Sequence, residues 1–270
     1  MSPSEDRSAA EARRSWWTAA TLLAVLAVVV AACSAPSGRQ LPPPAAPSGP
    51  ELVYVAVGAS ETVGFGADQP LREAWPRVLY RDELPESAVF VNMGIPGATV
   101  AQAIRDELPM ALSVRPALAT VWLNVNDIID GVDPDDFERD LGTLVKALRR
   151  EGATRVLVAN VPPIDRLPVY LACRPNPPTG GPPCRIGATL PGPEALNRVV
   201  DAYNSASERV VTREGAVLVD LRSVGLAARK AGTEDALVSG DGFHPSTAGH
   251  EAVADAFAEA LRGTGALEPG

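Results

Sequence analysis

The sequence predicts an α/β domain built on an open, doubly wound and mostly parallel sheet. Two observations carry this prediction: short runs that are apolar at nearly every position, which suit strands buried on both faces, and helical patterns that lie between them. Of the 270 residues, 46% are hydrophobic and 21% are charged, a balance that is ordinary for a folded domain. In such a sheet, ligands bind at the carboxyl ends of the strands.

Each element is justified by its own pattern, taken in chain order. Residues 52–57, 88–92 and 118–123 are short apolar runs of the kind that forms buried strands. Residues 135–150 carry apolar side chains at three- and four-residue spacings, with Gly152 just past the end, and this pattern predicts a helix. A strand at 154–159, a helix at 194–213, a strand at 216–221 and a final helix at 247–261 complete the alternation.

Charge and residue counts exclude several classes of protein. The chain has 33 Asp and Glu against 24 Lys and Arg, a net charge of −9, which argues against nucleic-acid binding. Only residues 16–32 form an apolar stretch of nearly membrane-spanning length, so a multi-span transporter is excluded. Two His and three Cys are too few for a zinc cluster of ordinary spacing, and we expect no metal and no cofactor.

Residues 1–32 have the organisation of a secretory signal. A basic flank precedes the uncharged apolar stretch 16–32, which ends in small residues. The segment then reads Val-Ala-Ala-Cys up to Cys33 and resembles the lipobox of bacterial lipoproteins. This resemblance implies that Cys33 is lipidated and becomes the mature N-terminus. An uncleaved signal anchor, or a simple signal with a chance Cys, is the alternative.

The segment after the signal predicts a tether. Residues 33–50 are rich in Pro, Ser, Ala and Gly, a composition that does not order itself and forms a semi-extended spacer. The folded domain is expected at 51–263, and residues 264–270 form a C-terminal tail. We therefore expect an extracytoplasmic domain, held at the cell membrane by a lipid anchor at Cys33.

One long irregular stretch interrupts the domain. Residues 162–193 are rich in proline and hold Cys173 and Cys184. A loop of this length is usually functional or disordered. In an exported protein the two Cys can form a disulfide worth about 3 kcal/mol, and two free thiols are the alternative. Cys33 is then the odd one, in keeping with a separate use as a lipid site.

Polar residues that suit nucleophilic catalysis stand at the strand ends. Ser60 follows the first strand and can present its hydroxyl at the carboxyl edge of the sheet, although a helix N-cap is the plainer interpretation. A serine nucleophile needs a base, and His244 stands just before the last helix. Asp241, three residues earlier, can hold one imidazole nitrogen and leave the other free. Both could also be merely solvated. His250, within the helix, is expected to be structural or at the surface.

A developing oxyanion needs hydrogen-bond donors. Gly97, after the second strand, can let its backbone N–H approach a substrate without obstruction, and Asn126, after the third, offers a side-chain amide. Asp127 is expected to brace its loop by accepting from backbone N–H groups. Each of these residues taken alone also has a simpler explanation, because Gly, Asn and Asp are common in turns. The set is more specific than its members, because it supplies a nucleophile, donors, a base and the residue that orients the base.

Taken in order, these residues resemble the four blocks of the SGNH hydrolases, also called the GDSL esterase/lipase family. Ser60, in Gly-Ala-Ser, stands where that family has its nucleophile, and Gly97 and Asn126 stand at its oxyanion glycine and asparagine. Asp241 and His244 match its Asp-x-x-His block. The resemblance spans about residues 52–262. It implies a flavodoxin-like three-layer α/β/α sandwich, metal-independent ester hydrolysis, and an oxyanion hole that includes the Ser60 N–H.

Two positions depart from the family pattern. Ala59 replaces an Asp that is not part of the triad, so the nucleophile is retained. Asn124 replaces a Gly, and its side chain could narrow the oxyanion region or add a polar contact. Gly94 is the second choice for the oxyanion glycine.

The sequence thus predicts a membrane-tethered serine esterase that acts, through an acyl-enzyme, on a small-molecule or polymer-borne ester. Acyl transfer to a surface polymer uses the same acyl-enzyme and is one alternative. A lipoprotein that binds a glycan or acyl chain without turnover is another, and a purely structural surface lipoprotein is a third. Acetyl esters, acylated sugars and longer lipids all fit the same catalytic set.

Overall fold

The computed structural model describes residues 52–180, 183–184 and 190–265, all within the unit Pro50–Gly270. The expected signal peptide (1–32), the tether (33–50) with Cys33, and residues 266–270 of the expected tail lie outside the described residues. Within the described part of the chain, no helix has the length and apolar character that a membrane crossing requires.

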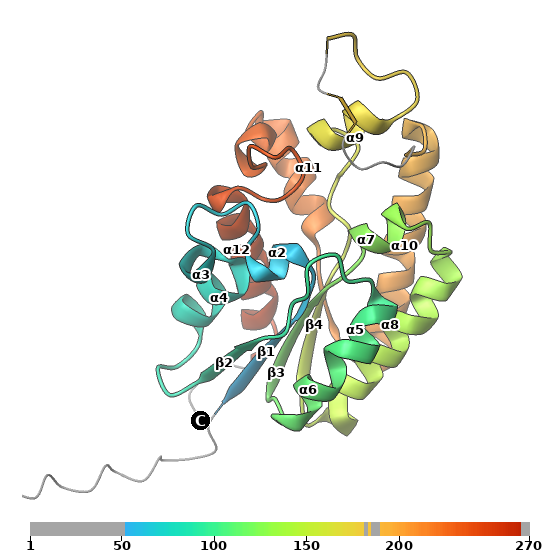
Figure 1. The fold of residues 1–270 in the computed structure, drawn as a ribbon. Helices are drawn as coiled ribbons and strands as arrows, with labels where there is room; N and C mark the ends of the chain where they lie inside the picture. Colours follow the sequence, from blue (N-terminus) through green and yellow to red (C-terminus); the bar gives the residue numbers. More distant parts are fainter. Residues whose placement is uncertain (1–51, 181–182, 185–189, 266–270) are drawn as a thin grey trace, which may run out of the picture. The chain divides into compact units, whose positions relative to one another are not determined.

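A sheet of five parallel strands, in the order β2-β1-β3-β4-β5, forms the middle of the domain (Figure 1). The strands are β1 (Val53–Gly58), β2 (Val89–Asn92), β3 (Leu118–Trp122), β4 (Arg155–Ala159) and β5 (Val217–Val219). Each overlaps one of the five predicted runs, so the strand predictions are confirmed. β5 is shorter than its run because Asp220 caps the next helix, where its carboxylate accepts a hydrogen bond from the Ser223 N–H.

The three long helices are also confirmed, each within one residue of its predicted ends. They are α8 (Pro134–Arg149), α10 (Pro193–Glu214) and α12 (Thr247–Arg262). Shorter helices that the sequence did not predict lie between them: α2 (Ser60–Val63), α3 (Pro70–Glu73), α4 (Trp75–Glu83), α5 (Val100–Asp106), α6 (Leu108–Ser113), α7 (Val125–Ile129), α9 (Pro168–Cys173) and α11 (Leu221–Ala231), with 3-10 helices η1 (Arg150–Gly152) and η2 (Glu234–Leu237).

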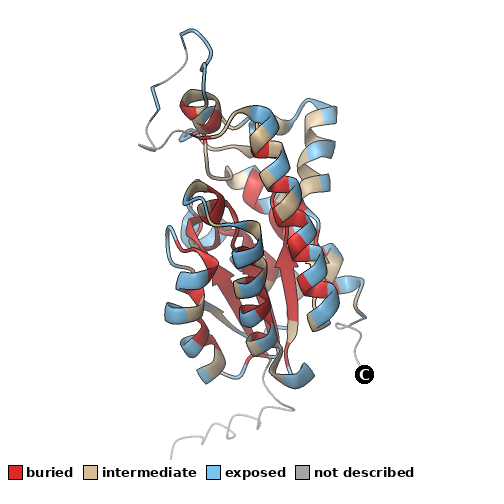
Figure 2. Cartoon of the chain, turned by 90° about the vertical axis from the view of Figure 1, so that its right-hand side faces the viewer, coloured by how far each residue is buried: buried red, intermediate tan, exposed pale blue. Residues whose placement is uncertain are grey.

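Helices cover both faces of the sheet and bury one apolar cluster on each. Successive strand residues point to opposite faces, so Val55 and Val57 pack in the cluster of α5, α8 and α10, while Tyr54 and Ala56 pack in that of α4 and α12. Figure 2 shows the buried strands between helices whose outer sides are exposed. This arrangement is the predicted three-layer α/β/α sandwich.

All five strands end at the same edge of the sheet, and the short helices α2, α7 and α9 gather there (Figure 1). The loops that leave β2, β1 and β3 are neighbours because those strands are neighbours. Residues that are far apart in the sequence therefore share one edge, and the predicted catalytic residues lie in these loops and in the loop before α12.

Candidate active site

The turn from β1 into α2 places Ser60 at the carboxyl edge. Gly58 ends the strand, and a Cβ at that position would lie 2.0 Å from the Thr62 hydroxyl oxygen, so only glycine fits so tight a turn. The Gly58 N–H donates to a carboxyl oxygen of Glu107 at 2.9 Å, and the Gly58 carbonyl accepts from the Ile95 N–H at 2.9 Å. Ser60 is 6% exposed and begins the helix. Glu107 and Ile95 thus fix the backbone two residues before the predicted nucleophile through both the N–H and the carbonyl of Gly58.

A chain of hydrogen bonds joins Ser60, His244 and Asp241. Nε2 of His244 lies 2.9 Å from Oγ of Ser60, and Nδ1 lies 2.6 Å from Oδ2 of Asp241. Because a carboxylate can only accept, Nδ1 carries the proton and Nε2 is free to take one from the serine. This arrangement of nucleophile, base and orienting carboxylate can support acyl transfer.

Asp241 also holds its own loop. Its Oδ1 accepts from the backbone N–H groups of Phe243 (2.8 Å) and His244 (2.9 Å) and from the Ser239 hydroxyl (2.7 Å). Partial burial of the carboxyl opposes ionisation, but these hydrogen bonds, with that from the His244 ring, lower the pKa of Asp241 to about 2. The carboxylate is therefore charged at every pH at which an imidazole titrates.

The loop after α2 presses directly against the loop that carries His244. Gly66 adopts φ +91°, and a Cβ there would lie 2.2 Å from the Pro245 carbonyl oxygen and 2.9 Å from the His244 Cβ. The neighbouring Phe65 ring lies with its centroid 5.4 Å from that of His244. Glycine at position 66 lets the two loops approach each other closely enough for the Ser60–His244 hydrogen bond.

His250 is structural, as predicted. It is fully buried in α12, where Nδ1 accepts from the Trp75 N–H at 3.3 Å and Nε2 lies 2.9 Å from the Phe65 carbonyl oxygen. Burial lowers the pKa of this imidazole, against a smaller opposing effect of its bond to Phe65. A neutral His250 therefore ties the segment after α2 to the last helix.

The predicted oxyanion donors lie on adjacent loops. Gly97, after β2, is exposed and has φ +81°, a backbone conformation that favours glycine, and no atom lies within 4 Å of where a Cβ would be. The competing candidate Gly94 instead donates its N–H to Asn92 at 2.9 Å. Asn126 uses one amide hydrogen to bond the Ala98 carbonyl at 3.0 Å, which leaves its second for a ligand. The Ser60 N–H, at the start of α2, has no partner within its helix.

Asn124 is one of the two departures from the family pattern, and its buried side chain bonds the backbone of a neighbouring strand. Its amide donates to the Ala159 carbonyl of β4 at 3.3 Å, and β4 lies on the opposite side of β3 from β1. The Asn124 side chain therefore makes a polar contact within the protein, to the backbone at the end of β4.

Asp127 accepts a backbone hydrogen bond, as expected, but the donor is on α5 and not on the loop of Asp127. Both of its carboxylate oxygens lie 3.2 Å from the Val100 N–H, at the start of α5. Burial raises the pKa of Asp127 to about 7, although this hydrogen bond partly offsets the effect.

Two buried carboxyl groups at the site were not predicted. Glu61 lies directly beside the nucleophile, with Oε2 3.5 Å from the Ser60 Oγ, and burial raises its pKa. Glu107, which holds Gly58, is 1% exposed, and burial raises its pKa to about 8. Nothing in the sequence marks either residue, because glutamate is normally at the surface.

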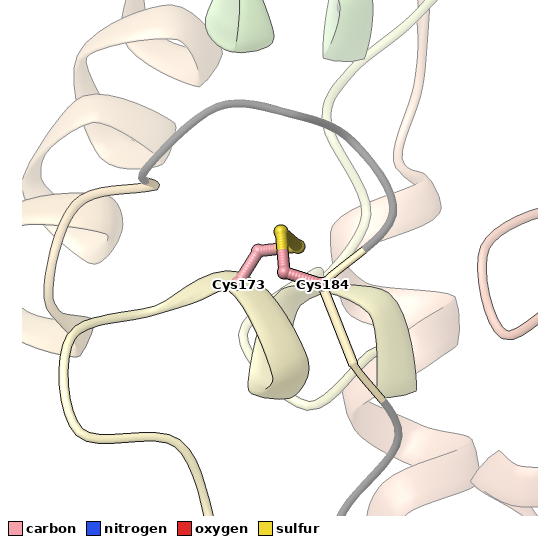
Figure 3. Close-up of a disulfide and its surroundings, with 2 residues drawn as sticks. All are labelled: Cys173 and Cys184. Carbon is pink, nitrogen blue, oxygen red and sulfur yellow. A yellow bond between two sulfur atoms is a disulfide. The ribbon is translucent and has the colours of Figure 1, made fainter.

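The two cysteines of the proline-rich stretch are bonded to each other, as predicted (Figure 3). The stretch is less irregular than expected, because α9 begins at Pro168 and ends at Cys173. Proline suits the first turn of a helix, where its missing N–H costs no hydrogen bond. The Tyr170 hydroxyl donates to the Pro191 carbonyl at 2.9 Å, so a second contact fastens the stretch near α10.

Two cavities share His244 as a wall. The first, of about 250 Å³, is mostly apolar and reaches from Glu61 to α11 and α12. The second, of about 640 Å³, is bordered by Asn126, Val169 and the loop of Asp241. In residues 52–180, 183–184 and 190–265, no group of three or more His, Cys, Asp or Glu side chains is placed to hold a metal ion.

An α/β/α sandwich that carries a Ser-His-Asp hydrogen-bond chain at the carboxyl edge of its sheet defines a class, the serine hydrolases of doubly wound fold. The model of the GDSL-like lipase/acylhydrolase family matches residues 56–252, and the chain belongs to this family. The protein is accordingly a hydrolase that acts on ester bonds. Among curated proteins, none gives a significant match to the sequence.

Solved structures share the fold at low sequence identity. A lipase/acylhydrolase from Enterococcus faecalis is 18% identical, over 81% of this chain and 98% of its own, with a TM-score of 0.59. The esterase EstA from Pseudoalteromonas sp., crystallised with the inhibitor monoethylphosphonate, is 19% identical, over 79% and 98%, with a TM-score of 0.55. An acetylxylan esterase from Geobacillus stearothermophilus is 20% identical, over 80% and 94%, with a TM-score of 0.56.

Proposed function

We propose that the protein is a membrane-tethered, extracytoplasmic serine esterase in which Ser60 is the nucleophile, His244 the general base and Asp241 the residue that orients the base. One observation carries the proposal: the hydrogen-bond chain from Ser60 Oγ through the His244 ring to Asp241, at 2.9 and 2.6 Å. A serine with a neutral imidazole acceptor at this distance is activated for attack on a carbonyl.

The reaction has two steps that conserve atoms and protons. The Ser60 oxygen attacks the ester carbonyl while His244 Nε2 takes its proton, and the charged imidazole then protonates the leaving alcohol. Water, deprotonated by the same nitrogen, attacks the acyl carbon. The charged imidazole then returns the proton to the Ser60 oxygen as its bond to the acyl carbon breaks, and the acid is released. The Ser60 and Gly97 N–H groups and the Asn126 amide stabilise the oxyanion in both steps.

The same proposal includes the tether. The lipobox-like sequence that ends at Cys33 is proposed to carry the lipid, residues 33–50 to form the spacer, and 51–263 to form the hydrolase domain. The Cys173–Cys184 disulfide supports this location, because such bonds persist mainly in oxidising compartments.

The test of catalysis uses the full-length protein and its Ser60→Ala variant on p-nitrophenyl esters from acetyl to long acyl chains. Loss of the nucleophile is expected to lower kcat/KM by at least about 10³-fold, with unchanged thermal unfolding. Ser113→Ala, an exposed serine on α6, is the matched control and retains activity. Wild-type turnover in Ser60→Ala would refute the assignment. Addition of an acceptor alcohol shows whether the acyl group passes to water or to the alcohol.

The test of tethering is labelling of growing cells with a fatty-acid analogue, with the protein mass measured beside it. The wild-type protein is expected to take up the label and to lose residues 1–32, whereas Cys33→Ala is expected to be unlabelled and to keep them, because the lipid site and the cleavage site are the same residue. A wild-type protein that carries no label and keeps residues 1–32 would instead indicate an uncleaved signal anchor.

A further inference from the structure

We propose that a cluster of arginines at the amino edge of the sheet, where its strands begin, binds the phosphate head groups of an anionic membrane and turns the active site away from the bilayer. The amino-edge cluster consists of Arg115, Arg149, Arg150 and Arg155. This inference rests on the proposed tether and adds the orientation of the domain. The esters within reach are then those in solution or on a polymer, and not the lipids of that membrane.

The amino-edge cluster is one connected piece of structure. The Thr154 hydroxyl joins the segments before β3 and β4, because it donates to the Pro116 carbonyl at 2.7 Å. One guanidinium nitrogen of Arg150 donates to the same carbonyl at 3.2 Å, and one of Arg149 donates to the Thr154 carbonyl at 3.2 Å. The other two members directly precede Pro116 and directly follow Thr154. Four guanidinium groups therefore extend from adjacent backbone.

The positive charge of the amino-edge cluster is not neutralised. None of the four arginines forms an ion pair with a carboxylate in the described part of the chain. Arg115 is exposed and the other three are partly exposed, so guanidinium N–H groups remain for phosphate oxygens. The acidic residue nearest in sequence, Glu151, is itself exposed. The C-terminal ends of α6 and α8 lie here, and their partial negative charge offsets the repulsion among four like charges.

The proposed tether joins the domain at this same edge. The Ala117 N–H, in the segment before β3, donates to the Val53 carbonyl at 2.9 Å, so the first residue of β1 lies beside the amino-edge cluster. A spacer over residues 33–50 has 18 residues. It extends to about 55 Å at most, which lets the domain approach the membrane with either edge. The charges on the two edges, and not the spacer alone, therefore decide the orientation.

The opposite edge, which carries the active site, is acidic. Residues 123–138, which follow β3, contain no Lys or Arg, whereas Asp130, Asp133 and Asp135 are all exposed there. With a net charge of −9, the chain as a whole is repelled by an anionic surface. Attraction thus depends on the uneven distribution of charge, which favours contact through the amino edge.

Fluorescence quenching in vesicles measures which edge faces the membrane. A thiol-reactive fluorophore is attached to full-length Ala153→Cys, in the segment of the amino-edge cluster, or to Asp130→Cys, at the end of α7, with the protein that lacks an added cysteine as the blank. Each is reconstituted into phosphatidylcholine vesicles with a head-group quencher, with or without phosphatidylglycerol. The label at position 153 is expected to be quenched about twofold more strongly in the anionic vesicles, and about 0.5 M salt is expected to remove the difference. The label at position 130 is expected to show no increase.

Charge variants test the arginines themselves. Arg115→Gln/Arg150→Gln, made in Ala153→Cys, is expected to lose at least about half of the extra quenching, because each basic residue near an anionic surface adds to the attraction. Arg72→Gln/Arg139→Gln is the matched control: it removes two charges from exposed positions on α3 and α8, and is expected to keep the extra quenching. Arg115→Lys/Arg150→Lys keeps the charge and is expected to behave like the wild type, which a purely structural role would not allow.

The outcomes keep this inference separate from the proposed function, because quenching requires no turnover. If the wild-type protein has no membrane attachment, it is sedimented with the same vesicles. Arginine-dependent sedimentation with anionic vesicles alone would then sustain the surface although the tether fails, and its absence would overturn both.

Three further results would overturn the inference. One is stronger quenching at position 130 than at position 153, and another is unchanged quenching in the folded Arg115→Gln/Arg150→Gln variant. The third is loss of the extra quenching in millimolar inorganic phosphate at constant ionic strength, which would assign the amino-edge cluster to a free anion.

Discussion

The loop of His244 and the first turns of α12 each present a histidine, and the two histidines have opposite surroundings. The His244 ring bonds two side chains, Ser60 and Asp241, that can give up or stabilise a proton. The His250 ring bonds two backbone groups, those of Trp75 and Phe65, that cannot exchange protons at ordinary pH. The comparison shows that the hydrogen-bond partners of a histidine, and not the residue type alone, determine whether it can act as a base or only links two segments of the chain.

Substitution of each histidine tests this contrast, and the largest loss of activity is expected for His244→Gln. Glutamine keeps a polar group in the loop but cannot act as a base at neutral pH, so kcat/KM is expected to fall by about 10⁴-fold or more. The unfolding temperature is expected to stay close to that of the wild type, because glutamine is of similar size and its amide can still donate to Asp241. Steady-state kinetics and calorimetry check both. A variant within about tenfold of wild-type activity would contradict the assignment.

Asp241→Asn is expected to have the next largest effect. The amide can donate to Nδ1, which moves the imidazole proton to Nε2, the nitrogen that must accept from Ser60. A fall in kcat of about 10²–10⁴-fold is expected, measured on the best p-nitrophenyl ester. Asp255→Asn, an exposed residue of α12, serves as the control and is expected to be fully active. Equal activity of the two variants would remove the orienting role of Asp241.

His250→Ala is expected to have the opposite effect to His244→Gln: the variant loses stability and keeps most of its activity. The buried Trp75 N–H and Phe65 carbonyl would lose their partner and a cavity would open, at a cost of about 2–4 kcal/mol in the free energy of unfolding. Turnover per folded molecule is expected to stay within about tenfold of the wild type, well above that of His244→Gln. Urea unfolding and kinetics on the same preparation measure both. Wild-type stability would show that the tie contributes little.

Two carboxyl groups near the site also have opposite surroundings: the pKa of Asp241 is lowered, whereas that of Glu107 is raised to about 8. The smallest of the expected effects is the pH dependence of stability that Glu107 causes. Glu107 is protonated in the folded state at pH values where the unfolded chain has ionised it. Its contribution to stability is therefore fully present below the ordinary pKa of a glutamate and is lost as pH rises through about 8.

Thermal unfolding between pH 5 and pH 9 measures this effect. Glu107→Gln is expected to reduce the decrease in unfolding temperature over that interval by about 2 °C or more. The variant is expected to keep part of the decrease in unfolding temperature, because Asp127, with a pKa of about 7, also ionises over this pH interval. An identical pH profile in wild type and variant would mean that Glu107 is ionised in the folded protein.

The sheet could be predicted because its strands are buried on both faces. In β3, for example, all five residues are buried and all but Thr120 are apolar, so the run stands out from the helices around it. The long helices repeat their apolar positions over several turns. Helices such as α2 and α9 are too short to show a period, and α2 exists only because the chain turns directly out of β1.

The site residues could be predicted where the reaction requires a particular residue type. They could not be predicted where a residue belongs to the site only because the fold buries it there. Ser60, Asp241 and His244 were predicted from their positions at the ends of elements and from the family resemblance, and the fold brings them into one hydrogen-bond chain. The burial of Glu61 and Glu107 depends on which loops pack over them, and no local pattern encodes that packing.

The hydrogen bond between Ser60 and His244 joins positions 184 residues apart, and it has a consequence for the order in which the protein is made. A ribosome produces β1 and Ser60 long before the segment with Asp241, His244 and α12. A nascent or truncated chain can contain all five strands of the sheet and still have no proton acceptor for its serine. Ester hydrolysis by Ser60 therefore cannot begin before position 244 has been synthesised, and a fragment that stops earlier is expected to be inactive.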